Sequence, residues 1–232
     1  MIPIVILAGG LGTRLNELTK STPKSLILIN EVPFVIHQLI LLKKSGFSRI
    51  HFCLGHLGEK VESEIKNHNI FKNMNITFSY DGENQLGTGG AIKNIIDKLP
   101  NYFFLTYGDS YLLTDYKKVL NYFNNTAKSS NESLMTVYKN NNKWDKSNVI
   151  FNGKWILKYS KNHDSKNMNF IDFGLSIISK NSFKLFNKKS IFDLSEYLSY
   201  QVENNSLLGY EVGKRFYEIG SIDGIRDLEK IL

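Results

Sequence analysis

The feature that most constrains the fold is an apolar run near the start of the chain that passes directly into a glycine-rich segment. Ile2 to Leu7 is unbroken and apolar, the pattern of a strand buried on both faces of a parallel sheet. The next residues read Ala8-Gly9-Gly10-Leu11-Gly12-Thr13-Arg14. Three glycines within four positions permit φ values that a side chain forbids, and they let backbone N–H groups approach an anion closely. We therefore expect an α/β sheet with an anion-binding turn after its first strand.

Strand and helix patterns alternate through the first half of the chain. Gly46 follows the first helical pattern as a C-cap. The alternation of strand and helix implies right-handed crossovers and a mainly parallel sheet covered by helices on both faces. The expected helices are Phe34 to Lys44, Leu57 to Asn67 and Gly89 to Lys98, and the expected strands after the first are Arg49 to Leu54, Ile76 to Tyr80 and Tyr102 to Tyr107.

The second half has shorter strand-like segments. We expect strands at Leu134 to Tyr138, Asn148 to Phe151, Trp155 to Tyr159, Phe170 to Ile178 and Val212 to Ile219, and helices at Asp193 to Glu203 and Ile222 to Leu232. The predicted architecture is a Rossmann-like, mainly parallel sheet flanked by helices, followed by a smaller mixed β region that covers one end of the sheet. In such sheets the ligand lies beyond the carboxyl ends of the strands.

Composition limits the class of protein. A chain of 232 residues, 42% of them hydrophobic, buries the core of one domain and is not disordered. Four prolines and one cysteine exclude proline-rich and disulfide-stapled chains. Cys53 lies in an apolar run, so we expect a small buried hydrophobe and a reducing compartment. The first apolar run is too short to span a membrane and lacks the basic leader of a signal peptide, so we expect a cytoplasmic protein.

The chain carries a basic surplus, with a formal net charge of +7. Such a field can serve nucleic acid, anionic lipid or a phosphorylated small molecule. The lysines are scattered, and no run of five or six like charges occurs. We therefore expect solvated surface lysines, with neither nucleic acid nor a membrane as partner.

Several chemistries lack their motif. The dinucleotide fingerprint G-x-G-x-x-G fits Gly10 and Gly12 but fails at Leu15, which disfavours a nicotinamide oxidoreductase, and no P-loop motif is present. The five histidines show no metal-ligand spacing with Cys53 or with one another. No G-x-S-x-G elbow is present, so nucleophilic hydrolysis has no support.

Taken together, the motifs resemble the signature of the nucleotidyltransferases that act on sugar 1-phosphates. The resemblance covers essentially the whole chain in the family's order. The segments that carry it are Leu7 to Leu15, Leu18-Thr19, Pro23-Lys24-Ser25-Leu26, Leu86 to Ala91, Gly108-Asp109-Ser110 and Phe216 to Ser221. The resemblance implies a glycosyltransferase-A-like fold in a single domain, 1–232, with a nucleotide-binding half at about 1–130 and a sugar-binding half at about 131–232.

The resemblance also implies a reaction. An oxygen of the sugar 1-phosphate attacks the α-phosphorus of a nucleoside triphosphate in line, and pyrophosphate leaves, so positioning and electrostatics do nearly all of the work. Arg14 offers a planar fork for the triphosphate, and Lys24 a point charge on the α-phosphate. The implied nucleotide-binding residues are Leu7, Ala8, Gly9, Gly10, Gly12, Thr13, Glu83, Gln85, Gly87 and Thr88.

A magnesium ion is the implied cofactor. Asp109 follows an aromatic strand and Gly108, so its carboxylate should emerge at the ligand edge of the sheet and bind Mg²⁺ as a catalytic residue. Family members carry a second carboxylate late in the chain, usually an Asp. Glu218 stands at that position here, one methylene longer.

The sugar phosphate site departs from the family pattern. Members usually have a Glu-Lys pair after a β segment; here Lys161 matches the lysine, and Ser160 replaces the acid. Asp172 and Gly174 stand where many members have Asn-x-Gly. The resemblance implies that Lys161, Asp172 and Gly174 bind the sugar phosphate, and the departures bear on which sugar is bound.

The pattern is closest to members that make GDP-heptose or GDP-mannose for surface polysaccharides, although the nucleobase stays open. Two alternatives also stay open. One is a non-catalytic regulatory subunit that binds a nucleotide-sugar, and the other is an enzyme for a phosphorylated polyol or choline. A homo-oligomer is compatible with the resemblance.

Overall fold

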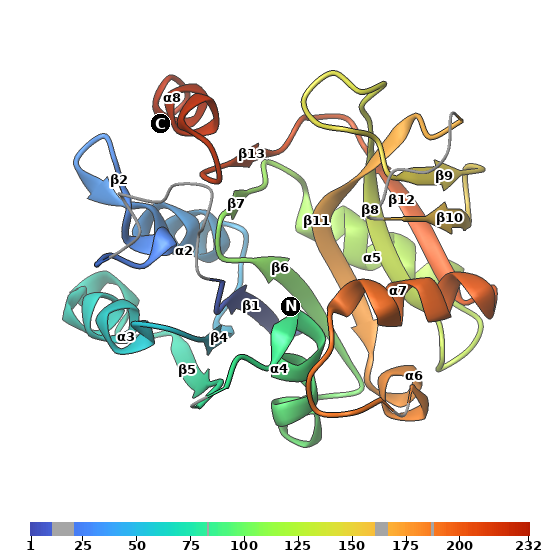
Figure 1. The fold of residues 1–232 in the computed structure, drawn as a ribbon, viewed down its shortest axis with the longest axis horizontal. Helices are drawn as coiled ribbons and strands as arrows, with labels where there is room; N and C mark the ends of the chain where they lie inside the picture. The colour runs from blue at the N-terminus through green and yellow to red at the C-terminus, as the bar shows by residue number, and fades with distance from the viewer. Residues whose placement is uncertain (11–20, 83, 161–166, 187) are drawn as a thin grey trace. The chain divides into compact units, whose positions relative to one another are not determined.

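The computed structural model describes residues 1–10, 21–82, 84–160, 167–186 and 188–232. The chain forms a mixed α/β protein with mostly parallel central strands flanked by helices, which confirms the predicted fold class (Figure 1). It divides into two compact units. Unit 1 comprises Met1–Gln85, Thr106–Tyr111 and Phe216–Leu232, and unit 2 comprises Leu86–Leu105 and Leu112–Arg215.

Three parallel strands form the centre of unit 1. They are β1 (Ile4–Ala8), β4 (Arg49–Leu54) and β5 (Asn75–Tyr80), in the order β1-β4-β5. In the register, Ile4 lies opposite Ile50 and Ala8 lies opposite Leu54. The first three residues of β1 are fully buried, which confirms the expectation of a strand covered on both faces. Helices α2 (Phe34–Lys44) and α3 (Gly58–Asn67) connect these strands.

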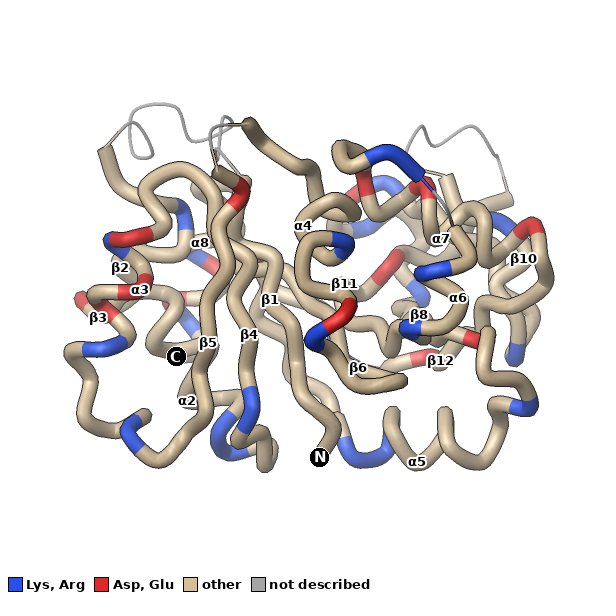
Figure 2. Tube along the Cα trace, turned by 90° about the horizontal axis from the view of Figure 1, so that it is seen from below, with Lys and Arg blue, Asp and Glu red and all other residues tan. Residues whose placement is uncertain are grey.

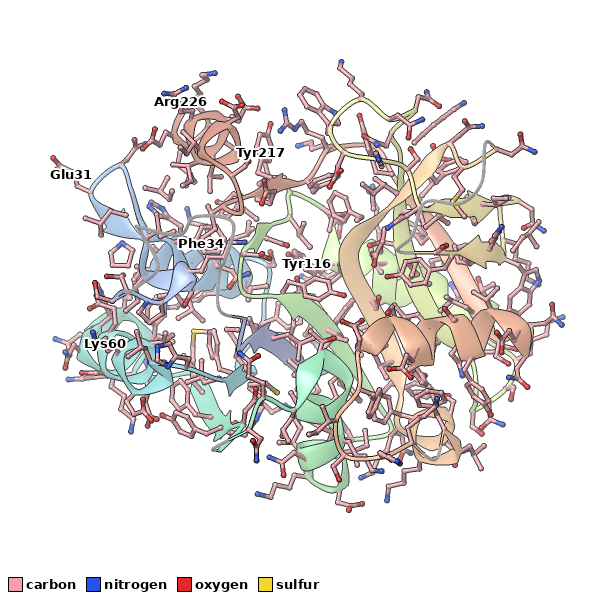
Figure 3. The ribbon with its side chains drawn as sticks, in the orientation of Figure 1. Glu31, Phe34, Lys60, Tyr116, Tyr217 and Arg226 are labelled. Atoms are coloured by element: carbon pink, nitrogen blue, oxygen red, sulfur yellow. The ribbon has the colours of Figure 1, made fainter. Side chains whose placement is uncertain are left out.

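Two short strand pairs and the last helix also belong to unit 1. Strands β2 (Leu28–Ile29) and β3 (Val32–Pro33) form a hairpin whose two turn residues, Asn30 and Glu31, have positive φ, as in the tight turns that match strand twist. Strands β7 (Ser110–Tyr111) and β13 (Tyr217–Glu218) pair antiparallel. Helix α8 (Ile222–Glu229) closes the chain beside the hairpin (Figure 1). Glu31 and Arg226 point outward from these two elements (Figure 3).

A mixed sheet forms the centre of unit 2. Strand β8 (Ser133–Lys139) pairs antiparallel with β11 (Phe170–Ser179) and parallel with β12 (Leu207–Val212). Strands β9 (Val149–Phe151) and β10 (Ile156–Tyr159) extend this sheet beyond β11, and β6 (Tyr102–Tyr107) begins in this unit. Helices α5 (Tyr116–Thr126) and α7 (Leu194–Glu203) cover opposite faces (Figures 1 and 2). Two further helices are α4 (Gly87–Ile95) and α6 (Lys180–Leu185).

The expected strand from Val212 to Ile219 is wrong. Strand β12 ends at Val212, and β13 begins only at Tyr217. Gly213-Lys214-Arg215 separates the two strands, and glycine weakens a strand interior because it has no side chain to pack. Helix α5 was also absent from the sequence prediction. It starts at the N-cap Asp115, whose side chain accepts a hydrogen bond from Lys118 N, and it buries a narrow apolar stripe.

Lysines and arginines are spread along the trace of both units, with acidic residues between them (Figure 2). The basic residues are therefore as scattered along the described backbone as they are in the sequence. Among the described residues, no helix has the length and apolar character needed to cross a bilayer.

Candidate active site

The turn after β1 is built from backbone segments that lie unusually close together. A Cβ placed on Gly55 would lie 2.5 Å from Gly9 O, and a Cβ on Gly108 would lie 2.6 Å from the Cβ of Ala8. Gly108 N donates a hydrogen bond of 2.8 Å to Leu7 O. These residues must be small because the end of β1 is pressed between the segment after β4 and the loop after β6. Gly10 is exposed, and a Cβ on it would meet no atom of the described residues within 4 Å.

Lys24 and Asp109 form an ion pair within unit 1. Lys24 opens the short 3-10 helix Lys24–Leu26, which begins after Pro23. Its Nζ lies 2.6 Å from Asp109 Oδ2, and the exposed fractions of the two side chains are 16% and 36%. The lysine is therefore largely enclosed, while the carboxylate keeps a face toward solvent.

Glu218 joins the same cluster through the pairing of β7 and β13. Glu218 lies opposite Ser110 in this pairing, and Ile219 N donates a 3.0 Å hydrogen bond to Asp109 O. Figure 3 shows Tyr217 on β13 beside β7. Backbone pairing thus brings the two carboxylates to adjacent positions although 109 residues of sequence separate them.

The Glu218 carboxylate accepts hydrogen bonds from residues that follow it directly in the chain. Gly220 N donates to Oε2, and Ser221 Oγ donates to Oε1 at 2.9 Å. A Cβ on Gly220 would overlap Glu218 Oε2 and would lie 2.8 Å from Lys24 Nζ. One point beside Gly220 is therefore flanked by both charged groups, so Lys24, Asp109 and Glu218 converge.

The donor set suits a hard divalent cation. Carboxylate oxygens are the ligands that Mg²⁺ prefers, and Mg²⁺ is commonly held by one or two carboxylates together with water and substrate phosphates. Across the described residues there is no group of three or more His, Cys, Asp or Glu side chains that could hold a metal. Asp109 and Glu218 supply two such carboxylates, so their donor chemistry fits a Mg²⁺ ion that shares its coordination with a phosphorylated ligand.

The second glycine-rich motif lies in unit 2, at the start of α4. Gly89 N and Gly90 N donate to Phe192 O at 3.0 and 3.2 Å, and Leu194 N donates to Thr88 Oγ1 at 2.8 Å. Gly87 has a φ of +72°, and a Cβ there would lie 2.5 Å from Phe192 O. The motif thus serves backbone packing against the segment before α7. That Gly87 and Thr88 also contact a nucleotide stays a prediction.

Gly89→Ala is expected to destabilise the protein. The added Cβ would overlap the Phe192 ring, and overpacking a core typically costs about 1–3 kcal/mol. Urea unfolding should show the loss as a lower midpoint with an unchanged slope. Gly213→Ala is the matched control because its Cβ would meet nothing within 4 Å. Equal midpoints for the two variants would contradict the packing role.

Asp172 and Gly174 lie together at an irregularity of β11 in unit 2. The register with β8 breaks between Asp172 and Ser176, and Gly174 has a φ of +91°. Gly174 N donates to Asp172 Oδ1 at 2.9 Å. Burial raises the pKa of the neighbouring Tyr159 hydroxyl, and the charges of Asp172 and Asp193 act in the same direction. Asp193 was missed as a neighbour of this cluster because it reads as the N-cap of α7, a role that it also has.

The predicted site contains six further residues, of which one is described. Gln85 is exposed at the end of the first segment of unit 1. The remaining predicted residues lie outside the described residues: Gly12, Thr13, Arg14, Glu83 and Lys161.

Sequence reasoning missed Gln38, which holds the loop that carries Asp109. Its Nε2 donates to Tyr107 O at 2.8 Å and to Ser110 O at 2.9 Å. The sequence signal for this role is a single amide side chain among the apolar residues that α2 buries, such as Phe34, Val35 and Leu39.

Cys53 is buried in β4, as the apolar run predicts. Burial raises the pKa of its thiol to about 12; a hydrogen bond with Ser79 opposes the rise, and the Asp81 carboxylate adds to it. The reactive thiolate fraction at pH 8 is then about a thousandfold below that of a thiol with the ordinary value of 9.0. We expect Ellman's reagent to modify Cys53 at pH 8 only in denaturant. Modification of the native protein within minutes would contradict this environment.

The sequence profile of the nucleotidyl transferase family matches residues 4–145 of the chain. The chain belongs to the nucleotidyl transferase family. It is a nucleotidyltransferase, and the matched segment includes β1, Lys24 and Asp109.

Relatives and a solved structure agree with this assignment. The chain is 28% identical over 195 residues to the D-glycero-alpha-D-manno-heptose 1-phosphate guanylyltransferase of Campylobacter jejuni, covering 84% of this chain and 83% of that protein. It is 32% identical over 136 residues to a putative mannose-1-phosphate guanyltransferase of Sulfolobus acidocaldarius, covering 58% of this chain and 36% of that longer protein. The structure of HddC from Yersinia pseudotuberculosis complexed with GMP-PN superposes with a TM-score of 0.81 at 23% identity, covering 100% and 99% of the two chains, and shows the shared fold.

Proposed function

We propose that this nucleotidyltransferase transfers a nucleoside monophosphate from a nucleoside triphosphate to a sugar 1-phosphate and releases pyrophosphate. Guanylyl transfer to heptose or mannose 1-phosphate is favoured, because the relatives reported above are named for these reactions. The product would be a GDP-sugar of the kind that supplies surface-polysaccharide synthesis.

The observation that carries the proposal is the convergence of Lys24, Asp109 and Glu218 near the end of β1. Nucleotidyl transfer brings two anions together, so a site for it needs fixed positive charge and a place for a divalent cation. Lys24 supplies the fixed charge. Its ammonium is already held in place by a carboxylate, so little reorganisation is needed when an α-phosphate oxygen arrives.

Asp109 and Glu218 would hold Mg²⁺, which when bound neutralises charge on the phosphate oxygens. Glu218 is longer than the aspartate usual at this position, and hydrogen bonds from Gly220 N and Ser221 Oγ fix its carboxylate. These bonds support a metal-binding role for Glu218 despite the extra methylene.

The triphosphate would lie along the turn after β1. Gly10 is exposed and has no side chain, which suits the close approach of a phosphate to the backbone. Gly12, Thr13 and Arg14, which the family signature assigns to the triphosphate, complete this part of the proposal. Leu7, Ala8, Gly9, Glu83, Gln85, Gly87 and Thr88 are the proposed remaining contacts to the nucleotide.

The sugar phosphate would contact Lys161 and the Asp172–Gly174 bulge. Gly174 N donates to Asp172 Oδ1 at 2.9 Å, and this hydrogen bond fixes the carboxylate. A fixed carboxylate beside a strand irregularity is suited to accept hydrogen bonds from sugar hydroxyls.

A matrix of pyrophosphate-release assays tests the proposal. Each of the five common nucleoside triphosphates is combined with heptose, mannose and glucose 1-phosphates, a polyol phosphate and choline phosphate, in the presence of Mg²⁺. We expect the highest rate for GTP with heptose or mannose 1-phosphate. Turnover with choline or polyol phosphate alone would move the acceptor outside the sugars. No turnover in any combination, with thermal stabilisation by a GDP-sugar, would establish the regulatory alternative instead.

A further inference from the structure

The loop between β6 and β7 carries Asp109, and a single side-chain amide donates hydrogen bonds to both of its ends. The carbonyl groups of Tyr107 and Ser110 flank Asp109 in sequence, and both accept hydrogen bonds from Gln38 Nε2, at 2.8 and 2.9 Å. The amide nitrogen of glutamine has two hydrogens, so both are used in this loop. The two hydrogen bonds therefore fix the curvature of the loop at Gly108 and Asp109, the two residues between these carbonyl groups.

The burial of Gln38 indicates that its two hydrogen bonds to the loop do more than fill space in the core. Gln38 is only 2% exposed, and the other buried residues of its helix, α2, are all apolar. Its Oε1 has no hydrogen-bond partner within the described part of the chain. A buried polar atom without a partner destabilises the folded state, because it has given up its hydrogen bonds to water. An apolar residue at this position would avoid that cost. What an apolar residue cannot supply is the pair of N–H donors, so we infer that these donors are the reason for a glutamine here.

The same loop links both carboxylates of the candidate site. Ile219 N donates to Asp109 O, and Glu218 lies opposite Ser110, so the loop also sets the position of β13. Gly108 N donates to Leu7 O and anchors the loop to β1. Gln38 spans this loop from Tyr107 to Ser110, so a change in the curvature of the loop would move Asp109 relative to Ser110 and therefore relative to Glu218, which lies opposite Ser110.

We propose that Gln38 is a positioning residue that sets the separation of the Asp109 and Glu218 carboxylates so that both can contact one divalent cation. The inference rests on the proposed metal-binding role of these two residues. Gln38 acts through the backbone of the loop and touches neither metal nor substrate. Loss of such supporting residues typically weakens metal affinity by about 10–100-fold.

Gln38→Met is the primary variant because methionine has a similar length and flexibility but no donor. Gln201→Met is the matched control. Gln201 is 1% exposed on α7 in unit 2, and its amide, oriented to satisfy its neighbours, donates to Ser206 O at 3.1 Å and Asn131 O at 3.0 Å. Both substitutions remove a buried amide that bonds two carbonyl groups, and only the first borders a candidate metal ligand.

The readout is Mn²⁺ binding, followed by the loss of the free-ion signal in electron paramagnetic resonance, with the Mg²⁺ concentration for half-maximal turnover as a second measure. We expect Gln38→Met to weaken Mn²⁺ binding at least about tenfold and to raise the Mg²⁺ requirement in parallel. The KM for the nucleotide at saturating Mg²⁺ should change little. Gln201→Met should match the wild type in each measure. If Gln38→Met does not fold, Gln38→Asn keeps an interior amide that is too short to reach both carbonyl groups, and it should weaken Mn²⁺ binding in the same direction.

The outcomes separate this inference from the proposed function. Wild-type Mn²⁺ affinity in a folded Gln38 variant, in a protein that turns over, would overturn the positioning role and leave the proposed function standing. A wild-type protein that binds no Mn²⁺ and releases no pyrophosphate would overturn both.

Discussion

Lys24→Met is expected to lower kcat by roughly 10²–10³-fold, the usual cost of removing one group that stabilises transition-state charge. Lys24 Nζ lies beside both Asp109 and Glu218, at the place proposed for the α-phosphate. The methionine keeps the length of the side chain and removes its charge. Steady-state kinetics at saturating nucleotide and sugar phosphate measure the effect.

The effect of Lys24→Met on stability should be small. The ion pair that it breaks leaves Asp109 with a side chain that is 36% exposed, and water can solvate that carboxylate. Lys60→Met is the control with the same change of charge. Lys60 lies on α3 of the same unit, where its Nζ donates to Ser21 O at 2.8 Å (Figure 3). A kcat for Lys24→Met within a few-fold of the control would show that Lys24 has no part in the chemistry.

Asp109→Asn is expected to lower kcat by about 10²-fold or more at a fixed Mg²⁺ concentration, because a neutral amide replaces a charged metal ligand. The substitution keeps the shape of the side chain and an oxygen that can accept a hydrogen bond from Lys24. The loss should therefore show as weaker metal dependence of turnover and weaker Mn²⁺ binding, with little change in the unfolding midpoint. Titration of activity with Mg²⁺ measures the first effect.

Asp97→Asn provides the matched control for Asp109→Asn. Asp97 also pairs with a lysine, since Lys184 Nζ lies 2.5 Å from Asp97 Oδ1, but this pair is exposed on unit 2. The hydrogen bond and charge of Lys184 lower the pKa of Asp97. Equal Mg²⁺ requirements for the two variants would remove Asp109 from the metal site.

Local patterns predicted much of unit 1. The bounds of α2 and β4 were predicted residue by residue, because a continuous apolar pattern ends at clear signals such as Gly46. Lys24 and Asp109 were proposed from short motifs that resemble the signature of the family. The short pairing of β7 with β13 depends on register between distant segments, so the sequence predicted the role of Glu218 without its hydrogen-bond anchors.

Other features depend on contacts that sequence periodicity does not encode. Gln38 occupies a position in a helix with an apolar pattern. Its role depends on hydrogen bonds to two carbonyl groups about 70 residues away in the chain, which the pattern does not indicate. Gly89 lies in the second glycine-rich motif, and the Phe192 ring leaves no room for a side chain there, a contact that the motif itself does not encode. Strand β12 was missed because Gly209 interrupts its apolar pattern, where a Cβ would collide with Phe151.

Pyrophosphate release from GTP tests the central claim most directly. The protein is mixed with GTP and Mg²⁺, with and without heptose or mannose 1-phosphate, and the products are identified by mass spectrometry. The account predicts pyrophosphate and an equal amount of GDP-sugar only when the sugar 1-phosphate is present, and a loss of both with Lys24→Met. Pyrophosphate formed without the acceptor, or full activity in Lys24→Met, would contradict it.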